Sequence, residues 1–390
     1  MKINLPPDVK KIIDELSHHN HEAYIVGGCV RDSIRNVVPK DWDITTSARP
    51  EDVMKIFPRT FETGIKHGTI TVLINRQGYE VTTYRIDGEY LDNRRPEQVS
   101  FTTDIKEDLS RRDFTINAIA YSPNWGFVDP FDGQGDIARK IIRCVGNAEE
   151  RFREDALRML RAIRFSGQLG FTVDAGAVEA IKAKGASIAN ISAERIRDEL
   201  TKLICSPYLE ALRLLESTGL LPYILDFNGN LDHVIGLLAN CPDKETLRLA
   251  IFFAFSGEGC AKLLRALRFD NKTIREVSLY VKLLPITIQL DRYEIKKYLR
   301  HMSQEYFENL LLLQSITNPH DGERLAAICR EARDIQAKGE CYTLRDLSVN
   351  GEDLACAGIP PGRAIGEKLE ELLDAVMRDP ALNDSLHRRI

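Results

Sequence analysis

Residues 23–46 read AYIVGGCVRDSIRNVVPKDWDITT, and this stretch decides the fold of the first third of the chain. The apolar run AYIV predicts a buried strand, Gly27 and Gly28 predict a tight turn, and CVRDSIR has the spacing of a helix. A second strand is expected to open at residues 41–46, DWDITT. Paired glycines between a strand and a helix let backbone N–H groups approach a phosphate, and Arg31 adds a positive charge one turn into the helix.

Strand patterns continue outward from this stretch to about residue 143 and then give way to helical spacing. The strand-like runs are TITVLI (69–74), YEVTTYRI (79–86), GFVDPF (126–131) and IIRCVG (141–146). Beyond residue 147 apolar side chains recur every three or four positions, which is typical of amphipathic helices. The sequence therefore predicts an α+β head followed by a helical remainder, with breaks near Ser206, residues 226–232 and residues 318–322.

Composition limits the class of protein. The chain has 390 residues, 43% of them hydrophobic and 28% charged, and a net charge of −5. These values exclude a disordered chain and one coated in positive charge, so any contact with nucleic acid must use a local basic patch. We expect a cytoplasmic protein with no membrane contact, since no apolar run approaches the roughly 18–20 residues of a membrane span. The eight cysteines form no C-x-x-C pair and are expected to stay reduced.

Asp41 and Asp43 are candidate metal ligands. In a strand, residues two apart point to the same face, so the two carboxylates would repel each other unless a divalent cation lay between them. Oxygen ligands suit Mg²⁺, which can bridge them to the phosphates of a nucleotide. A lone D-x-D is more often a polar strand start that faces water. The preceding G-G-x-x-R-D motif favours the metal site here.

Four ordered motifs carry a family resemblance: GGCVRD (27–32), DWDI (41–44), RRDFTINA (111–118) and EDALRMLRAIRF (154–165). Together they resemble the nucleotidyltransferase branch that contains bacterial class II tRNA nucleotidyltransferases (CCA-adding enzymes) and poly(A) polymerases. The resemblance implies that Asp41 and Asp43 bind two Mg²⁺ ions. It also implies that Gly28, Arg31 and Arg112 bind the nucleotide and its phosphates.

Several residues around these motifs have supporting or less certain roles. Glu80 is a candidate third catalytic carboxylate, although an edge-strand glutamate that pairs with Arg85 explains it almost as well. The resemblance gives Gly27, Asp113 and Asn117 supporting roles.

Residues 154–165 are similar to the family's nucleotide-selecting helix. On an ideal helix Glu154, Arg158 and Arg161 share one face, with Asp155 beside it. Cytosine and adenine both offer an amino donor next to a ring-nitrogen acceptor, so an Asp155–Arg158 pair would accept C and A and refuse U and G. Glu154 would fix Arg158 by an ion pair. For Arg164, a role in binding the nucleotide is implied by the family resemblance alone. The alternative is an amphipathic helix with surface arginines.

The resemblance also implies a domain order and a function. We expect a head at residues 1–143, a neck at 144–208, a body at 209–317 and a tail at 318–390, the last three all-α. The tail, with Arg363, would grip the tRNA elbow, although a simple capped helix explains the same pattern. The loop 87–101, with Arg94 and Arg95, is similar to the loop the family uses to switch from cytidine to adenosine.

The expected activity is Mg²⁺-dependent, template-independent addition and repair of the 3′-terminal CCA of tRNA from CTP and ATP, with release of pyrophosphate. An enzyme that adds only the terminal adenosine shares every motif above. A poly(A) polymerase and a non-catalytic tRNA-binding protein are weaker alternatives. No stable protein partner is implied.

Overall fold

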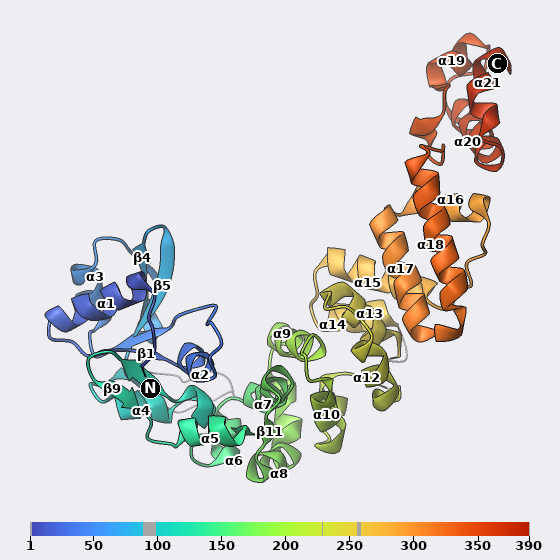
Figure 1. The fold of residues 1–390 in the computed structure, drawn as a ribbon. Coiled ribbons are helices and arrows are strands. Elements are labelled where there is room, and N and C mark those ends of the chain that lie inside the picture. Colours follow the sequence, from blue (N-terminus) through green and yellow to red (C-terminus); the bar gives the residue numbers. More distant parts are fainter. Residues whose placement is uncertain (1, 89–98, 228, 256–258, 390) are drawn as a thin grey trace. The chain divides into compact units, whose positions relative to one another are not determined.

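The structure is a computed structural model that describes residues 2–88, 99–227, 229–255 and 259–389. The chain forms two compact units (Figure 1), one of Met1–Ile235 with Leu263–Phe269 and the other of Gly236–Lys262 with Asp270–Ile390. Among the described helices, none combines the length and the apolar character needed to span a bilayer. The four domain boundaries expected from the sequence stay a prediction.

A seven-stranded mixed sheet forms the head, in the order β3-β4-β5-β2-β1-β8-β9. Strands β2 and β5 are parallel, with Ile44 opposite Val81, and the other neighbours are antiparallel. This mixed sheet fits the α+β head that was expected, but no strand was expected at β3 or β8. The strands are β1 Ala23–Val26, β2 Ile44–Thr46, β3 Thr60–Gly64, β4 Thr69–Ile74, β5 Gln77–Thr83, β8 Ala120–Ser122 and β9 Gly126–Val128.

Short helices cover this sheet. Helices α1 and α3 lie together beside β4 and β5 (Figure 1). Helix α1 is amphipathic and buries Val9, Ile12, Ile13 and Leu16. The helices of the head are α1 Pro7–His18, α2 Gly28–Ile34, α3 Pro50–Ile56, α4 Ile105–Ser110 and α5 Gly133–Arg139.

The two strands that follow β5 in the chain form a separate two-stranded sheet. It pairs β6 Arg85–Asp87 with β7 Val99–Phe101. Residues 89–98, with the loop arginines Arg94 and Arg95, lie outside the described residues.

The expected selecting helix is broken in two. Helix α6 Ala148–Glu154 ends before Asp155, whose backbone is extended (φ −140°, ψ 104°), and α7 Leu157–Leu169 begins two residues later. The prediction of one continuous helix was therefore wrong, and Glu154 and Asp155 do not share a helix face with Arg158. The physical reason is local, because the Asp155 carboxylate accepts the backbone N–H of Leu157 at 3.1 Å and so replaces a helical hydrogen bond.

Helices make up nearly all of the rest. The short strands β10 Ile141–Ile142 and β11 Thr172–Val173 pair in parallel on either side of α6 and α7. The expected break near Ser206 falls between α9 and the short helix that follows it. The other two expected breaks reach into helices, because α12 begins at Leu231 and α18 begins at Gly322. The larger helices that follow are α8 Ala175–Lys184, α9 Ala193–Ile204, α12 Leu231–Ala239, α13 Glu245–Ala254, α15 Asn271–Leu283, α16 Arg292–His301, α17 Gln304–Thr317, α18 Gly322–Ala337, α20 Arg363–Arg378 and α21 Ala381–Arg389.

The second unit has a core of its own. None of the eight cysteines, all of them within the described residues, forms a disulfide. In the second unit Leu373, Val376 and Met377 of α20 pack with Cys341. The buried Lys296 joins this core, because its amine pairs with Glu340 at 2.8 Å and donates to the Met377 carbonyl at 3.1 Å.

Candidate active site

Gly27 shapes the turn between β1 and α2. Its backbone has φ +80° and ψ −130°, a region in which any residue with a side chain is strained. A Cβ at this position would also lie 3.3 Å from Nη1 of Arg112. The turn therefore brings the backbone of Gly27 close to the Arg112 guanidinium, and only glycine fits there without strain.

A cavity of about 200 Å³ lies beside this turn, and five charged residues of the head line it. Asp43 precedes β2, where its carbonyl accepts the N–H of Val26 at 3.0 Å. Glu80 occupies the matching position in the parallel strand β5, so both carboxylates reach the cavity. The other charged residues that line it are Arg85, Arg111 and Arg112.

The position of Glu80 corrects one expectation. Strand β5 lies between β4 and β2, so Glu80 is on an interior strand, and the edge-strand interpretation was wrong. Arg85 forms an ion pair with Asp87 at 3.2 Å. Glu80 thus remains available as a third carboxylate of the cavity.

Asp41 and Asp43 interact electrostatically. The cavity walls limit the hydration of Asp43 and raise its pKa, the Arg112 guanidinium offsets part of this effect, and the negative charge of Asp41 raises the pKa further. Within the described ranges, no group of three or more His, Cys, Asp or Glu side chains is arranged to hold a metal ion. A pair of carboxylates fits Mg²⁺, which takes its other ligands from water and substrate phosphates.

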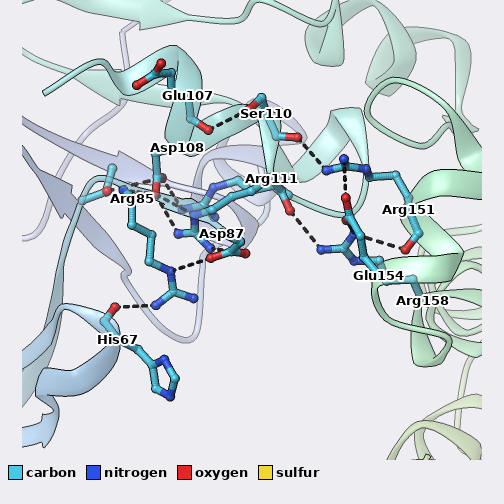
Figure 2. Close-up of polar contacts among 12 residues, drawn as sticks. His67, Arg85, Asp87, Glu107, Asp108, Ser110, Arg111, Arg151, Glu154 and Arg158 are labelled. Carbon is cyan, nitrogen blue, oxygen red and sulfur yellow. Dashed lines mark hydrogen bonds and ion pairs between the residues drawn. The ribbon is translucent and has the colours of Figure 1, made fainter. Parts of the chain in front are cut away.

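Asp108, on α4, anchors the arginines of the cavity and was missed by the sequence analysis. Its side chain is fully buried. It accepts hydrogen bonds from Nη2 of Arg111 at 2.7 Å and from the backbone N–H of Arg85 at 3.4 Å (Figure 2). It also accepts one from Nη2 of Arg112 at 3.2 Å. Burial opposes ionisation, but the charges of Arg112 and Arg111 lower the pKa of Asp108 below its ordinary value. Its spacing, three and four residues before the two arginines, was the available signal.

Arg112 has hydrogen-bond donors left for a ligand. A guanidinium carries five N–H groups, and one of them, on Nη2, binds Asp108. Its Nε is buried and lacks a hydrogen-bond partner in the part of the chain that the structure describes. An arginine held on one side by a carboxylate is suited to bind phosphate oxygens with its remaining donors.

A chain of hydrogen bonds joins the head to α7 through Asp113 and Asn117. Asp113 accepts from Arg161 at 2.6 Å and from the Asn117 amide at 3.1 Å, and Asn117 accepts from Nη1 of Arg31 at 2.8 Å. Burial raises the pKa of Asp113, but the charge and hydrogen bond of Arg161, with smaller effects of Arg158 and Asn117, together outweigh it and hold the pKa at about 2. Arg31 is buried and its other two nitrogens bind Asp32, so its guanidinium braces the turn.

Arg158 lies at the junction of the head and the selecting segment. The expected ion pair with Glu154 is present at 2.5 Å, and Arg151 binds the other carboxylate oxygen of Glu154. Nη2 of Arg158 donates to the backbone carbonyl of Arg111 at 2.9 Å (Figure 2). The side chain of Arg111 lines the cavity and binds Asp108, while the backbone carbonyl of Arg111 binds Arg158. Arg111 therefore connects the cavity to Arg158.

Helix α9 supplies two partners that the sequence analysis did not identify. Arg195 binds the Asp155 carboxylate at 2.7 and 3.2 Å. Glu199 binds Nε of the buried Arg164 at 2.7 Å. Asp155 is therefore held by Arg195, whereas Arg158 is held by Glu154. The i, i+4 spacing of Arg195 and Glu199 was the only signal in the sequence.

The mixed sheet, the paired aspartates and the arginine-lined cavity define a nucleotidyltransferase head. Residues 23–143 match the Poly A polymerase head domain. Residues 170–227 match the RNA- and SrmB-binding region of polymerase A, and residues 241–385 match tRNA nucleotidyltransferase domain 2.

Relatives extend over the whole length. The CCA-adding enzyme of Geobacillus kaustophilus is 39% identical over 96% of this chain and 93% of its own. That of Lactobacillus johnsonii is 36% identical over 98% of this chain and 97% of its own. A crystal structure of the Bacillus stearothermophilus CCA-adding enzyme in complex with CTP superposes with a TM-score of 0.83 at 34% identity, over 96% of this chain and 94% of that one. The chain belongs to the family of CCA-adding enzymes, which are tRNA nucleotidyltransferases.

Proposed function

We propose that this protein builds and repairs the 3′-terminal CCA of tRNA from CTP and ATP, with release of pyrophosphate. The observation that carries the proposal is the cavity in which Asp43 and Glu80 face Arg112, within a chain similar to CCA-adding enzymes along its whole length. The full-length relatives carry the name of the complete CCA reaction, which favours it over addition of adenosine alone.

Each part of the site has a role in this reaction. Asp41 and Asp43 would hold Mg²⁺, which when bound lowers the pKa of the RNA 3′-hydroxyl and neutralises the triphosphate for in-line attack at the α-phosphorus. Glu80, which lines the same cavity, would add a third carboxylate. Arg112 would donate to a phosphate oxygen, and Gly27 and Gly28 keep the adjacent backbone free of side chains.

Base selection falls to the segment between α6 and α7. Asp155 would accept the exocyclic amino group of cytosine or adenine, and Arg158 would donate to the neighbouring ring nitrogen. Glu154, Arg161 and Arg164 hold this segment through ion pairs and hydrogen bonds. tRNA and nucleoside triphosphates as substrates also fit a cytoplasmic location.

The test uses a tRNA transcript that lacks all three terminal nucleotides, incubated with Mg²⁺, CTP and ATP. Growth by C, C and A, read on a sequencing gel, supports the proposal. Addition of one adenosine to a tRNA that already ends in CC, with no growth of the shorter transcript, would make this the adenosine-adding enzyme. Asp41→Ala should abolish extension, and extension that survives this change would refute the metal assignment.

A further inference from the structure

The ion pair between Arg195 and Asp155 is bidentate. Nη1 of Arg195 donates to Oδ1 of Asp155 at 3.2 Å and Nη2 donates to Oδ2 at 2.7 Å. The two planar groups thus meet side by side, which fixes the plane of the carboxylate as well as its position. The pair is largely shielded from water, with the side chain of Asp155 only 14% exposed.

Asp155 needs such a partner because of where it lies. The residue sits in the extended break between α6 and α7, so no regular helix fixes its side chain. Its Oδ1 accepts from Arg195 and also from the backbone N–H of Leu157, which uses both lone pairs of that oxygen. Oδ2 accepts from Arg195 alone among the described residues. One lone pair, on Oδ2, is left to accept a hydrogen bond from a nucleotide.

Helix α9 holds the selecting segment at two points. Arg195 binds Asp155, and Glu199, one turn later, binds Arg164 at 2.7 Å and Arg161 at 3.5 Å. Arg195 and Glu199 lie on one face of α9. The Asp155 carboxylate and the two arginines of α7 are therefore held by the same helix.

We propose that Arg195 is a positioning residue for base selection, a role that rests on the proposed function. It orients Asp155 so that the remaining lone pair of Oδ2 meets the exocyclic amino group of cytosine or adenine. Uracil and guanine place a carbonyl oxygen at that point, and a fixed carboxylate repels it. Without Arg195 the carboxylate can rotate, so the correct base loses a well-aligned acceptor and the wrong base is no longer refused.

The test compares Arg195→Gln with Arg195→Lys and with Arg197→Gln. Arg197 is the control, since it lies on the same helix but its guanidinium binds Asp198 and the backbone carbonyl of Arg268. The quantity measured is kcat/KM for CTP and for UTP on a tRNA that lacks all three terminal nucleotides. Arg195→Gln should lower the CTP:UTP ratio by about tenfold or more, since hydrogen bonds to charged groups are among the stronger ones. Arg195→Lys keeps the positive charge but cannot bind both carboxylate oxygens of Asp155 at once, so it should give an intermediate CTP:UTP ratio. Arg197→Gln should leave the ratio unchanged.

The double variant Asp155→Ala with Arg195→Gln separates positioning from general destabilisation. Its ratio should equal that of Asp155→Ala alone, since Arg195 acts through Asp155. Equal losses for CTP and UTP in Arg195→Gln, with an unchanged ratio, would overturn the inference and leave Arg195 a structural residue. Failure of the wild-type protein to extend tRNA would instead refute the proposed function.

Discussion

Replacement of Asp113 by asparagine should weaken the head in a pH-dependent way. Asp113 is a buried carboxylate that accepts hydrogen bonds from Arg161 and Asn117, and its pKa is held at about 2. Asparagine has nearly the same shape but cannot carry the charge that Arg161 needs. The variant therefore removes the electrostatic part of the contact and leaves most of the packing in place.

The size of the effect follows from the pKa. An unfolded aspartate titrates near 3.9, so a folded value of about 2 corresponds to about 2.5 kcal/mol of stability at neutral pH. Because the folded pKa is depressed, this contribution is complete above about pH 5 and disappears as the pH falls through the folded value. Near pH 3 roughly half of it remains.

Tryptophan fluorescence is the assay, because Trp42 and Trp125, the only tryptophans, both lie in the head. Urea unfolding at pH 7, 5, 4 and 3 gives the free energy of unfolding of the wild type and of Asp113→Asn. The difference should be constant from pH 7 to 5 and shrink below pH 4. Asp52→Asn, which removes an exposed pair with Lys55, should cost less than about 1 kcal/mol. A difference that stays the same at pH 7 and pH 3 would refute the electrostatic reasoning.

Two further changes test the cavity. Gly27→Ala should raise the KM for nucleoside triphosphates severalfold, because the new Cβ displaces the Arg112 guanidinium; steady-state kinetics measure this. The strain at a positive φ, about 1 kcal/mol, should lower the stability of the head. Asp108→Asn leaves Arg111 and Arg112 without their buried counter-charge. It should lower the free energy of unfolding of the head by about 3 kcal/mol, measured by urea unfolding, and raise the KM for nucleoside triphosphates, measured by steady-state kinetics. Glu107→Gln, an exposed neighbour on α4, is the control and should change neither quantity.

Each of these changes has an outcome that would contradict its reasoning. An unchanged KM in Gly27→Ala would mean that the turn tolerates a side chain beside Arg112. For Asp108→Asn, stability lost without a rise in KM would mean that Asp108 supports the fold and does not orient Arg112 for phosphate.

The sequence predicted those parts of the fold that local patterns control. The run AYIV with Gly27 and Gly28 predicted β1 and its turn, and the helical remainder followed from apolar spacing. Strand β8 was missed because residues 120–122 are short and carry no turn residue before them. The break at Asp155 was missed because the sequence there has helical spacing throughout, and one side-chain hydrogen bond to Leu157 overrides it.

The candidate site was predictable only in part. Asp43 and Arg112, which belong to two of the motifs, line one cavity, and Glu80, which belongs to none, lines it too. The expected pair of Glu154 with Arg158 is present. Partners distant in sequence were not visible. Arg195 lies 40 residues from Asp155, and its i, i+4 spacing to Glu199 does not point to that partner, so the contact depends on how α9 packs against α7.

The parallel pair β10–β11 makes the selecting segment a closed loop. Ile141 and Ile142 pair with Thr172 and Val173, so the chain between them, which includes α6 and α7, is tied at both ends. Closing a loop of about 30 residues costs about 3 kcal/mol of chain entropy, and folding meets that cost before any substrate arrives. The segment that we propose reads the base is therefore held at both ends in advance, and a nucleotide that binds it should lose little of its affinity to arranging the protein.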